Sequence, residues 1–313
     1  MNKGFKVIFM GTPAFAVPTL DLLSKSHHNV TLVVTQPDRP MGRGKKLTPP
    51  PVKQTANELG YDILQPETLR TDAISDQIKA YQPDVFVVVA FGHILTAKLL
   101  SIPKYGAINV HASLLPKYRG PSPIQWAIIN GEKETGITTI HMDQGMDTGN
   151  ILLSLKIPVY DDDTSSSLHD RLADLGAELL IRTLKLLGTK NLQPIPQNNS
   201  LSTYAPMLTK RDGHIDWSLP AEKIERCIRA MTPWPGVFTF HEEKRLKIFS
   251  SSVKKMDSAK PPGTVLEGSP NELTVSTGKH GLSILEIQSE SGKKLAIKDF
   301  LRGYKIHPGD ILK

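Results

Sequence analysis

Residues 1–190 alternate between strand-like and helix-like stretches, and this alternation constrains the fold more than any other feature of the chain. Short apolar runs typical of buried strands, such as Lys6–Met10 and Asp84–Ala90, are separated by stretches with helical periodicity. A parallel sheet produces this pattern because each crossover between parallel strands needs a covering helix. The sequence therefore predicts an α/β fold with a doubly wound, mostly parallel sheet in this part of the chain.

The pattern changes after residue 188. Asn, Gln, Pro and Ser dominate the next residues without periodicity, which indicates a linker. Beyond the linker, short alternating strands separated by turn residues predict a small OB-like β-barrel. With 313 residues the chain is long enough for two domains. We expect a first domain over residues 1–188, a linker over 189–205 and a barrel domain over 206–313.

Composition excludes several classes of protein. The longest unbroken apolar run, Val85–Phe91, is far shorter than the roughly 18 to 20 residues that cross a bilayer. The first residues lack the long apolar stretch and the cleavage site of an export signal. The single cysteine, Cys227, allows no intrachain disulfide, in agreement with a reducing compartment. We therefore expect a cytoplasmic protein that is not bound to a membrane.

The charge balance makes an anionic partner plausible. The chain carries 38 basic and 31 acidic residues, a formal net charge of +7. Residues 206–313 alone hold 18 of the basic and 13 of the acidic residues. A second basic segment, Gln36–Lys53, contains the single acid Asp38 among five basic residues. By itself, such a segment is more typical of a solvated loop than of a binding surface.

The stretch Gly106–Ile151 gathers polar side chains at the end of a predicted strand. Asn109 and His111 are two residues apart, so both project from one face of that strand. The following loop, which three prolines stiffen, leaves the carboxyl end of the strand, where open α/β sheets bind ligands. The glycine-rich loop Asp143–Gly149 can bring the carboxylate of Asp147 back against the imidazole.

An amide, an imidazole and a carboxylate suit acyl transfer without a covalent intermediate. Asn109 can donate to a developing oxyanion, His111 can donate to it or move a proton, and Asp147 can hold His111 in one tautomer. On spacing alone, the alternative that these are ordinary strand-end and turn residues stays open. The ten histidines show no helical pairing, and the sequence has no H-E-x-x-H, G-x-S-x-G or phosphate-loop motif, so we expect no metal centre.

Longer motifs carry a resemblance to a known family. The run NVHASLLPKYRG at Asn109–Gly120, followed by DxGxDxG at Asp143–Gly149, closely resembles the 10-formyltetrahydrofolate-dependent formyltransferases. The resemblance extends from Phe9–Pro13 through the basic segment to the barrel. It implies a Rossmann-like formyltransferase domain that moves a formyl group from 10-formyltetrahydrofolate to an amine. More particularly, it implies the members that formylate the α-amino group of methionine esterified on initiator tRNA.

The same resemblance implies roles for individual residues. The residues implied to be catalytic are Asn109, His111 and Asp147. Those implied to line the tetrahydrofolate site are Ser113, Leu114, Leu115 and Pro116. Those implied to contact the acceptor end of tRNA are Arg43, Lys45 and Lys46. The basic barrel would grip the tRNA backbone through salt-dependent phosphate contacts. We expect a monomer whose partners are methionyl-tRNA and folate, and no bound metal.

Two alternatives remain open. Another N-formyltransferase, for example one that acts on an amino sugar nucleotide, would use the same three catalytic residues and differ in the basic segment and the barrel. A nucleic-acid-binding protein with an inactive α/β domain would keep the basic regions, but it would have no physical reason to retain the catalytic residues and the SLLP loop. Formylation of charged initiator tRNA distinguishes these possibilities.

Overall fold

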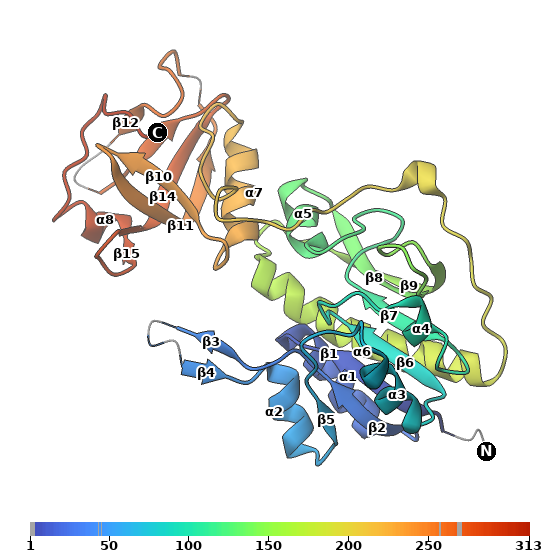
Figure 1. Cartoon of the computed structure of the whole chain (residues 1–313). Coiled ribbons are helices and arrows are strands. Elements are labelled where there is room, and N and C mark those ends of the chain that lie inside the picture. Colours follow the sequence, from blue (N-terminus) through green and yellow to red (C-terminus); the bar gives the residue numbers. More distant parts are fainter. Residues whose placement is uncertain (1–3, 43, 45, 257, 268–270) are drawn as a thin grey trace. The chain divides into compact units, whose positions relative to one another are not determined.

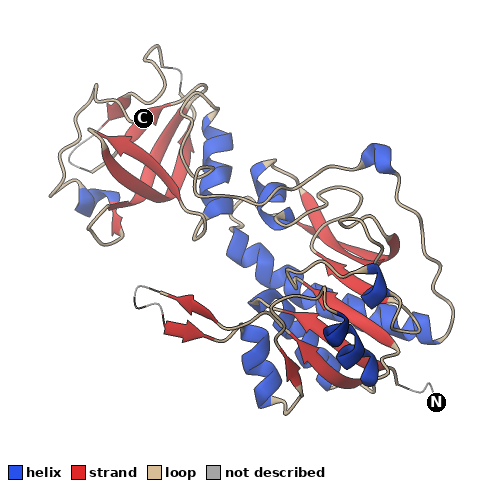
Figure 2. Cartoon of the chain, in the orientation of Figure 1, coloured by secondary structure: helices blue, strands red, loops and turns tan. Residues whose placement is uncertain are grey.

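The computed structural model describes residues 4–42, 44, 46–256, 258–267 and 271–313, shown in Figures 1 and 2. It divides into two compact units. The first contains the described residues up to Pro123 together with Glu134–Pro158 and His169–Ala205. The second contains Ile124–Lys133, Val159–Leu168 and Pro206–Lys313. Within these ranges, no helix combines the length and the apolar character that a membrane span requires.

The first unit is built on a seven-stranded sheet with the order β5-β2-β1-β6-β7-β8-β9. The five strands from β5 to β7 pair in parallel, and β8 pairs antiparallel with both β7 and β9. The prediction of an α/β, mostly parallel sheet is confirmed. Its strands are β1 (Lys6–Gly11), β2 (Asn29–Val34), β5 (Ile63–Leu64), β6 (Val85–Val89), β7 (Ala107–His111), β8 (Glu134–His141) and β9 (Asn150–Pro158).

Helices cover both faces of this sheet (Figure 2). On one face, Phe86 and Val88 of β6 pack in a buried cluster with Ile78 and Leu99. On the other face, Val110 of β7 lies against Gly176. Strands buried on both faces read as continuous apolar runs, which is why β1 and β6 were predictable. The helices are η1 (Ala14–Ala16), α1 (Val17–Ser24), α2 (Pro51–Glu58), α3 (Asp72–Ala80), α4 (Ala97–Leu100), α6 (Ser165–Gly188) and η2 (Asn199–Leu201).

The chain after β1 differs from what its sequence indicates. Thr12 and Pro13 resemble the start of a helix, but the chain forms the single turn η1 before α1 begins. The hydroxyl of Thr12 does not cap a helix: it donates to the carbonyl oxygen of Phe91 at 2.9 Å and accepts from the N–H of Gln36 at 3.4 Å. These bonds tie together the loops that follow β1, β2 and β6.

The basic segment Gln36–Lys53, which the sequence indicates to be a loop, contains a two-stranded hairpin. Its strands are β3 (Arg39–Met41) and β4 (Lys46–Thr48), and they pair with each other and with no other strand of the described residues. The hairpin leaves the sheet after β2 and leads into α2 (Figure 1).

The second unit contains a six-stranded antiparallel sheet in which β10, β11, β14, β13 and β12 follow one another and β15 pairs with β14. The helix α7 buries Ile224 and Ile228, which are four residues apart on its apolar face. The elements are α5 (Pro123–Ile129), α7 (Ala221–Met231), β10 (Val237–His241), β11 (Lys244–Lys254), β12 (Val265–Glu267), β13 (Thr274–Ser276), β14 (Gly281–Ser289), β15 (Leu295–Ala296) and α8 (Ile297–Phe300).

Residues near the C-terminus join the two outer strands of this sheet. Lys313 exchanges two backbone hydrogen bonds with Phe240 of β10, at 2.7 and 2.9 Å. Asp310 accepts from the N–H of Val265 in β12 at 2.8 Å. Because one short segment bonds to both edges, the sheet curls into a small barrel. The prediction of a small barrel domain is thereby confirmed.

Candidate active site

The strand β7 presents Asn109 and His111 on the face of the sheet that carries α3 and α4. Alternation along the strand turns Val110 to the opposite face, where it is buried. His111 is buried and Asn109 is half-buried at the carboxyl end of the strand. Both residues lie where the strand passes into the loop that begins at Ala112.

The carboxylate of Asp147 lies between these two side chains. Its Oδ1 accepts from Nδ2 of Asn109 at 3.2 Å, and its Oδ2 is 3.6 Å from Nδ1 of His111. Oδ2 also accepts from the backbone N–H of Gly120 at 2.9 Å. The backbone of Asp147 has a φ of +55°, a left-handed conformation that Asp adopts more readily than most residues. The structure therefore brings together the three residues that the sequence predicted to be catalytic.

The imidazole of His111 is hydrogen-bonded through Nε2, and its Nδ1 lies near a carboxylate. Its Nε2 lies 2.9 Å from the carbonyl oxygen of Tyr118. Because a carbonyl oxygen only accepts hydrogen bonds, Nε2 is the donor and carries a hydrogen. Nδ1 faces the carboxylate of Asp147. Any positive charge that develops on the ring therefore meets an acceptor at each nitrogen, which is the environment that proton transfer by a histidine needs.

The loop predicted to line the folate site is fixed by β8. The hydroxyl of Thr138 donates to the carbonyl oxygen of Ser113 at 2.7 Å and accepts from the N–H of Leu115 at 3.2 Å. Ser113 and Leu115 are buried, whereas Leu114 and Pro116 are half-buried. Leu114 and Pro116 therefore keep accessible side-chain surface, whereas the side chains of Ser113 and Leu115 are covered by the surrounding chain.

One polar residue that the sequence did not single out, Gln197, holds the Asp147 loop. The side chain of Gln197 donates to the carbonyl oxygens of Asp147 at 2.7 Å and Gly149 at 2.8 Å, and it accepts from Arg119. Its partners are 48 to 78 residues away in the sequence. Nothing in the polar composition of the linker distinguishes Gln197 from its neighbours, so only the fold reveals this contact.

Of the residues implied to contact tRNA, Lys46 lies on β4 and is exposed. Arg43 and Lys45 lie outside the described residues. Lys53 of the same basic segment forms an ion pair within the protein: its Nζ is 2.8 Å from both carboxylate oxygens of Asp38. The hydrogen bond from Gln65, followed by the one from Lys53, holds the pKa of the Asp38 carboxyl below its ordinary value. These bonds anchor the base of the hairpin and compensate one of its charges.

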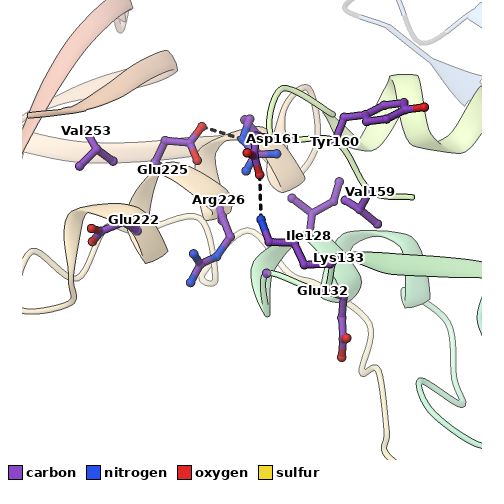
Figure 3. A pocket seen from close by; sticks show the side chains of 12 residues that line it. Ile128, Glu132, Lys133, Val159, Tyr160, Asp161, Glu222, Glu225, Arg226 and Val253 are labelled. Carbon is purple, nitrogen blue, oxygen red and sulfur yellow. Dashed lines mark hydrogen bonds and ion pairs between the residues drawn. The ribbon is translucent and has the colours of Figure 1, made fainter. Parts of the chain in front are cut away.

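A separate pocket of about 250 Å³ lies within the second unit (Figure 3). Lys133 pairs with Asp161 at 2.9 Å and Arg229 pairs with Glu225 at 2.6 Å in its wall. None of the residues predicted to be catalytic lines this pocket. No cluster of three or more potential metal-ligating side chains is found in the part of the chain that the structure describes. We therefore take the carboxyl end of β7 as the candidate active site.

Two family models cover most of the chain. A model described as formyl transferase matches residues 5–184, and one described as formyl transferase, C-terminal domain, matches residues 207–305. The chain belongs to the formyl transferase family and is a formyltransferase enzyme. It is 50% identical over 309 residues to a methionyl-tRNA formyltransferase from Caldanaerobacter subterraneus subsp. tengcongensis, which covers 98% of this chain and 100% of that protein. A protein of the same name from Citrifermentans bemidjiense is 49% identical over 309 residues, which is 99% of this chain and 96% of that protein.

Solved structures share the fold. An N-formyltransferase from Helicobacter canadensis, in complex with folinic acid and dTDP-3-aminofucose, superposes with a TM-score of 0.66 at 20% identity. The match covers 93% of this chain and 99% of that chain. The family models and the curated relatives thus confirm the expected formyltransferase family, and the solved structure confirms the expected fold.

Proposed function

We propose that this protein transfers the formyl group of 10-formyltetrahydrofolate to the α-amino group of methionine on initiator methionyl-tRNA. The observation that carries the proposal is the similarity, over nearly the whole chain, to relatives named methionyl-tRNA formyltransferase. The meeting of Asn109, His111 and Asp147 at the end of β7 supports it. The formylated folate in the Helicobacter canadensis complex supports a folate donor.

Asn109 is positioned to stabilise the charge that develops during transfer. As the neutral amine adds to the formyl carbon, negative charge moves onto the formyl oxygen. The side-chain amide of Asn109 carries two hydrogens, of which the bond to Asp147 uses one. The second can donate to the formyl oxygen, and a donor held in place by Asp147 needs no reorganisation as the charge appears.

The transfer also requires that a proton leave the attacking amine, and Asp147 and His111 lie where they can assist this step. The amine forms a bond to the formyl carbon, the bond from that carbon to the folate nitrogen breaks, and one proton passes from the amine to that nitrogen. Asp147 orients His111 through Nδ1 and can take the amine proton through water. For Nε2 of His111 to donate to the formyl oxygen, it must exchange its present bond to Tyr118. Such bonds commonly rearrange or tighten once a substrate is bound.

The distribution of charge supports a tRNA acceptor. The exposed Lys46 on the hairpin, together with Arg43 and Lys45, would contact the acceptor end. Residues 206–313, with 18 basic and 13 acidic residues, would hold the phosphate backbone. A small amine acceptor such as an amino sugar nucleotide has no need of two separate basic regions.

Formylation of charged initiator tRNA, with an amino sugar nucleotide as the alternative acceptor, tests the proposal. With the folate donor present, we expect formylmethionyl-tRNA from the wild type and no formylated sugar. Asn109→Ala and His111→Ala should each lower turnover by about 10² to 10³, because each removes a group that acts on the developing charge. Their affinity for charged tRNA should stay close to that of the wild type.

The exposed residue Asn57 on α2 provides the matched control, and Asn57→Ala should retain full turnover. Formylation of the sugar nucleotide in place of tRNA would overturn the assignment of the acceptor. A loss of tRNA affinity in Asn109→Ala or His111→Ala as large as the loss of turnover would overturn the assigned roles.

A further inference from the structure

The segment 189–205 is bonded to the loop that follows β7. The N–H of Arg119 donates to the carbonyl oxygen of Thr203 at 2.9 Å, and the N–H of Ala205 donates back to the carbonyl oxygen of Arg119 at 2.7 Å. The N–H of Tyr118 donates to the hydroxyl of Thr203 at 2.8 Å. These bonds fix the segment against the loop whose Tyr118 carbonyl holds His111.

The side chain of Gln197 extends this attachment to the second catalytic loop. Its Nε2 donates to the carbonyl oxygens of Asp147 and Gly149, at 2.7 and 2.8 Å. Its Oε1 accepts from Nε and Nη2 of Arg119, at 3.1 and 2.8 Å. A glutamine amide has two donor hydrogens and two acceptor lone pairs, so the bonding capacity of Gln197 is filled. One amide therefore connects the loop at Arg119 with the loop at Asp147.

Asp147 needs such an attachment more than an ordinary loop residue does. Its positive φ is a conformation that a non-glycine residue keeps only when the surrounding structure imposes it. The carbonyl oxygen that Gln197 binds belongs to this same residue. A rotation of that carbonyl would turn the backbone at the Cα of Asp147 and shift the carboxylate that binds Asn109. A displacement of about 1 Å in a catalytic group can cost roughly 100-fold in rate.

From this geometry we infer that Gln197, in the segment 189–205 of the first unit, is a positioning residue for Asp147. The inference rests on the proposed function, since it assumes that Asp147 takes part in formyl transfer. Gln197 lies between the two family models, which end at residue 184 and begin at residue 207. Neither model includes it.

Two substitutions separate the positioning role from a merely structural one. Gln197→Ala removes all four hydrogen bonds. Gln197→Glu keeps an acceptor for Arg119 but cannot donate to the carbonyl oxygens of Asp147 and Gly149. If donation to these carbonyls positions Asp147, both variants lower kcat by about 10- to 100-fold while KM for tRNA and for folate stays unchanged. The pH profile of kcat also changes in both, because a displaced Asp147 no longer faces His111 in the same way.

The control is Gln193→Ala, which alters an exposed glutamine of the same segment and should keep the wild-type kcat. Thermal unfolding of each variant shows whether a loss of activity reflects a loss of folded protein. A Gln197→Glu variant with the wild-type kcat and pH profile would overturn the positioning role. So would variants in which KM for tRNA rises and kcat does not change. If the wild type formylates no charged tRNA, the proposed function itself fails, whereas an active wild type with an equally active Gln197→Ala overturns only this inference.

Discussion

Acid should destabilise the first unit through His28. This residue precedes β2, and only 7% of it is exposed. Its Nδ1 accepts from the N–H of Phe5 at 3.1 Å, and its ring stacks on that of Phe5 with centroids 5.4 Å apart. Burial, followed by the charge of the neighbouring His27, lowers the pKa of His28 from 6.5 to about 4. A proton on Nδ1 would point at the N–H of Phe5 and break this hydrogen bond, so folding disfavours the charged form of the ring.

The sign of the effect follows from the protons bound. Between about pH 4 and pH 6.5, the unfolded chain holds a proton on His28 that the folded chain does not. The free energy of unfolding therefore falls as the pH falls through this window. The full contribution is present above pH 6.5 and is lost below about pH 4. At about 1.4 kcal/mol for each pKa unit, the loss is about 3 kcal/mol, a large part of the stability of a typical domain.

Urea unfolding at neutral and acidic pH measures this loss. His28→Asn is the informative variant, because the Asn side chain offers an acceptor to Phe5 but does not titrate. The stability advantage of the wild type over this variant should shrink by about 3 kcal/mol between neutral pH and about pH 4. Titrating carboxyl groups affect both proteins equally and cancel in the difference. His27→Asn, at an exposed position, should keep most of the wild-type dependence. An advantage that stays constant across the window would refute the reasoning.

Three further predictions concern the catalytic loop and the basic hairpin. Gly120 has a φ of +115°, and a Cβ there would lie 2.8 Å from the carbonyl oxygen of Ala205. Because the N–H of Gly120 binds the carboxylate of Asp147, Gly120→Ala should displace that carboxylate and lower kcat in the formylation assay by at least about tenfold. Unchanged kcat would contradict it. Lys46→Ala should weaken tRNA binding and reduce the slope of log affinity against log salt by about one, measured by titration at several salt concentrations. An unchanged slope would count against a phosphate contact. Asp38→Asn removes the negative charge that pairs with Lys53 at the base of the hairpin. Because the hairpin would then be less firmly anchored, KM for tRNA should rise while kcat stays unchanged. A lower kcat with an unchanged KM would argue against this anchoring role.

Much of the sheet was predictable because its central strands are buried on both faces. Such strands leave continuous apolar runs. The structure places β1 at Lys6–Gly11 and β6 at Val85–Val89, each within one residue of the range that the sequence predicts. The edge strand β9 (Asn150–Pro158) was missed, because its longest apolar run has only three residues and exposed residues alternate with half-buried ones over the rest of the strand. The two residues of β5 are too few to give any pattern. The hairpin β3–β4 escaped notice because its residues are mostly charged, Gly or Pro.

The candidate site was predictable to different degrees. A period of two along a strand is enough to place Asn109 and His111 on one face. The glycine-rich loop Asp143–Gly149 indicated that Asp147 can approach the imidazole, and the family resemblance implied that it does. The loop conformation that achieves the approach has a positive φ at Asp147, which residue spacing does not determine. For Gln197, neither a strand period nor a motif of the family resemblance indicated a role. Its partners lie in two loops that the chain forms long before it reaches the linker.

Residues with positive φ lie in the loops that hold the proposed catalytic side chains, and this explains why the segment 189–205 matters for the site. Tyr118, Gly120 and Asp147 have φ values of +60°, +115° and +55°. The N–H of Tyr118 is bound by Thr203, the N–H of Gly120 by the carboxylate of Asp147, and the carbonyl of Asp147 by Gln197. Such conformations persist only where the surroundings impose them. Two of these three bonds come from the segment 189–205. The loops that hold the proposed catalytic side chains therefore depend on residues beyond 188, although Asn109, His111 and Asp147 all precede that point.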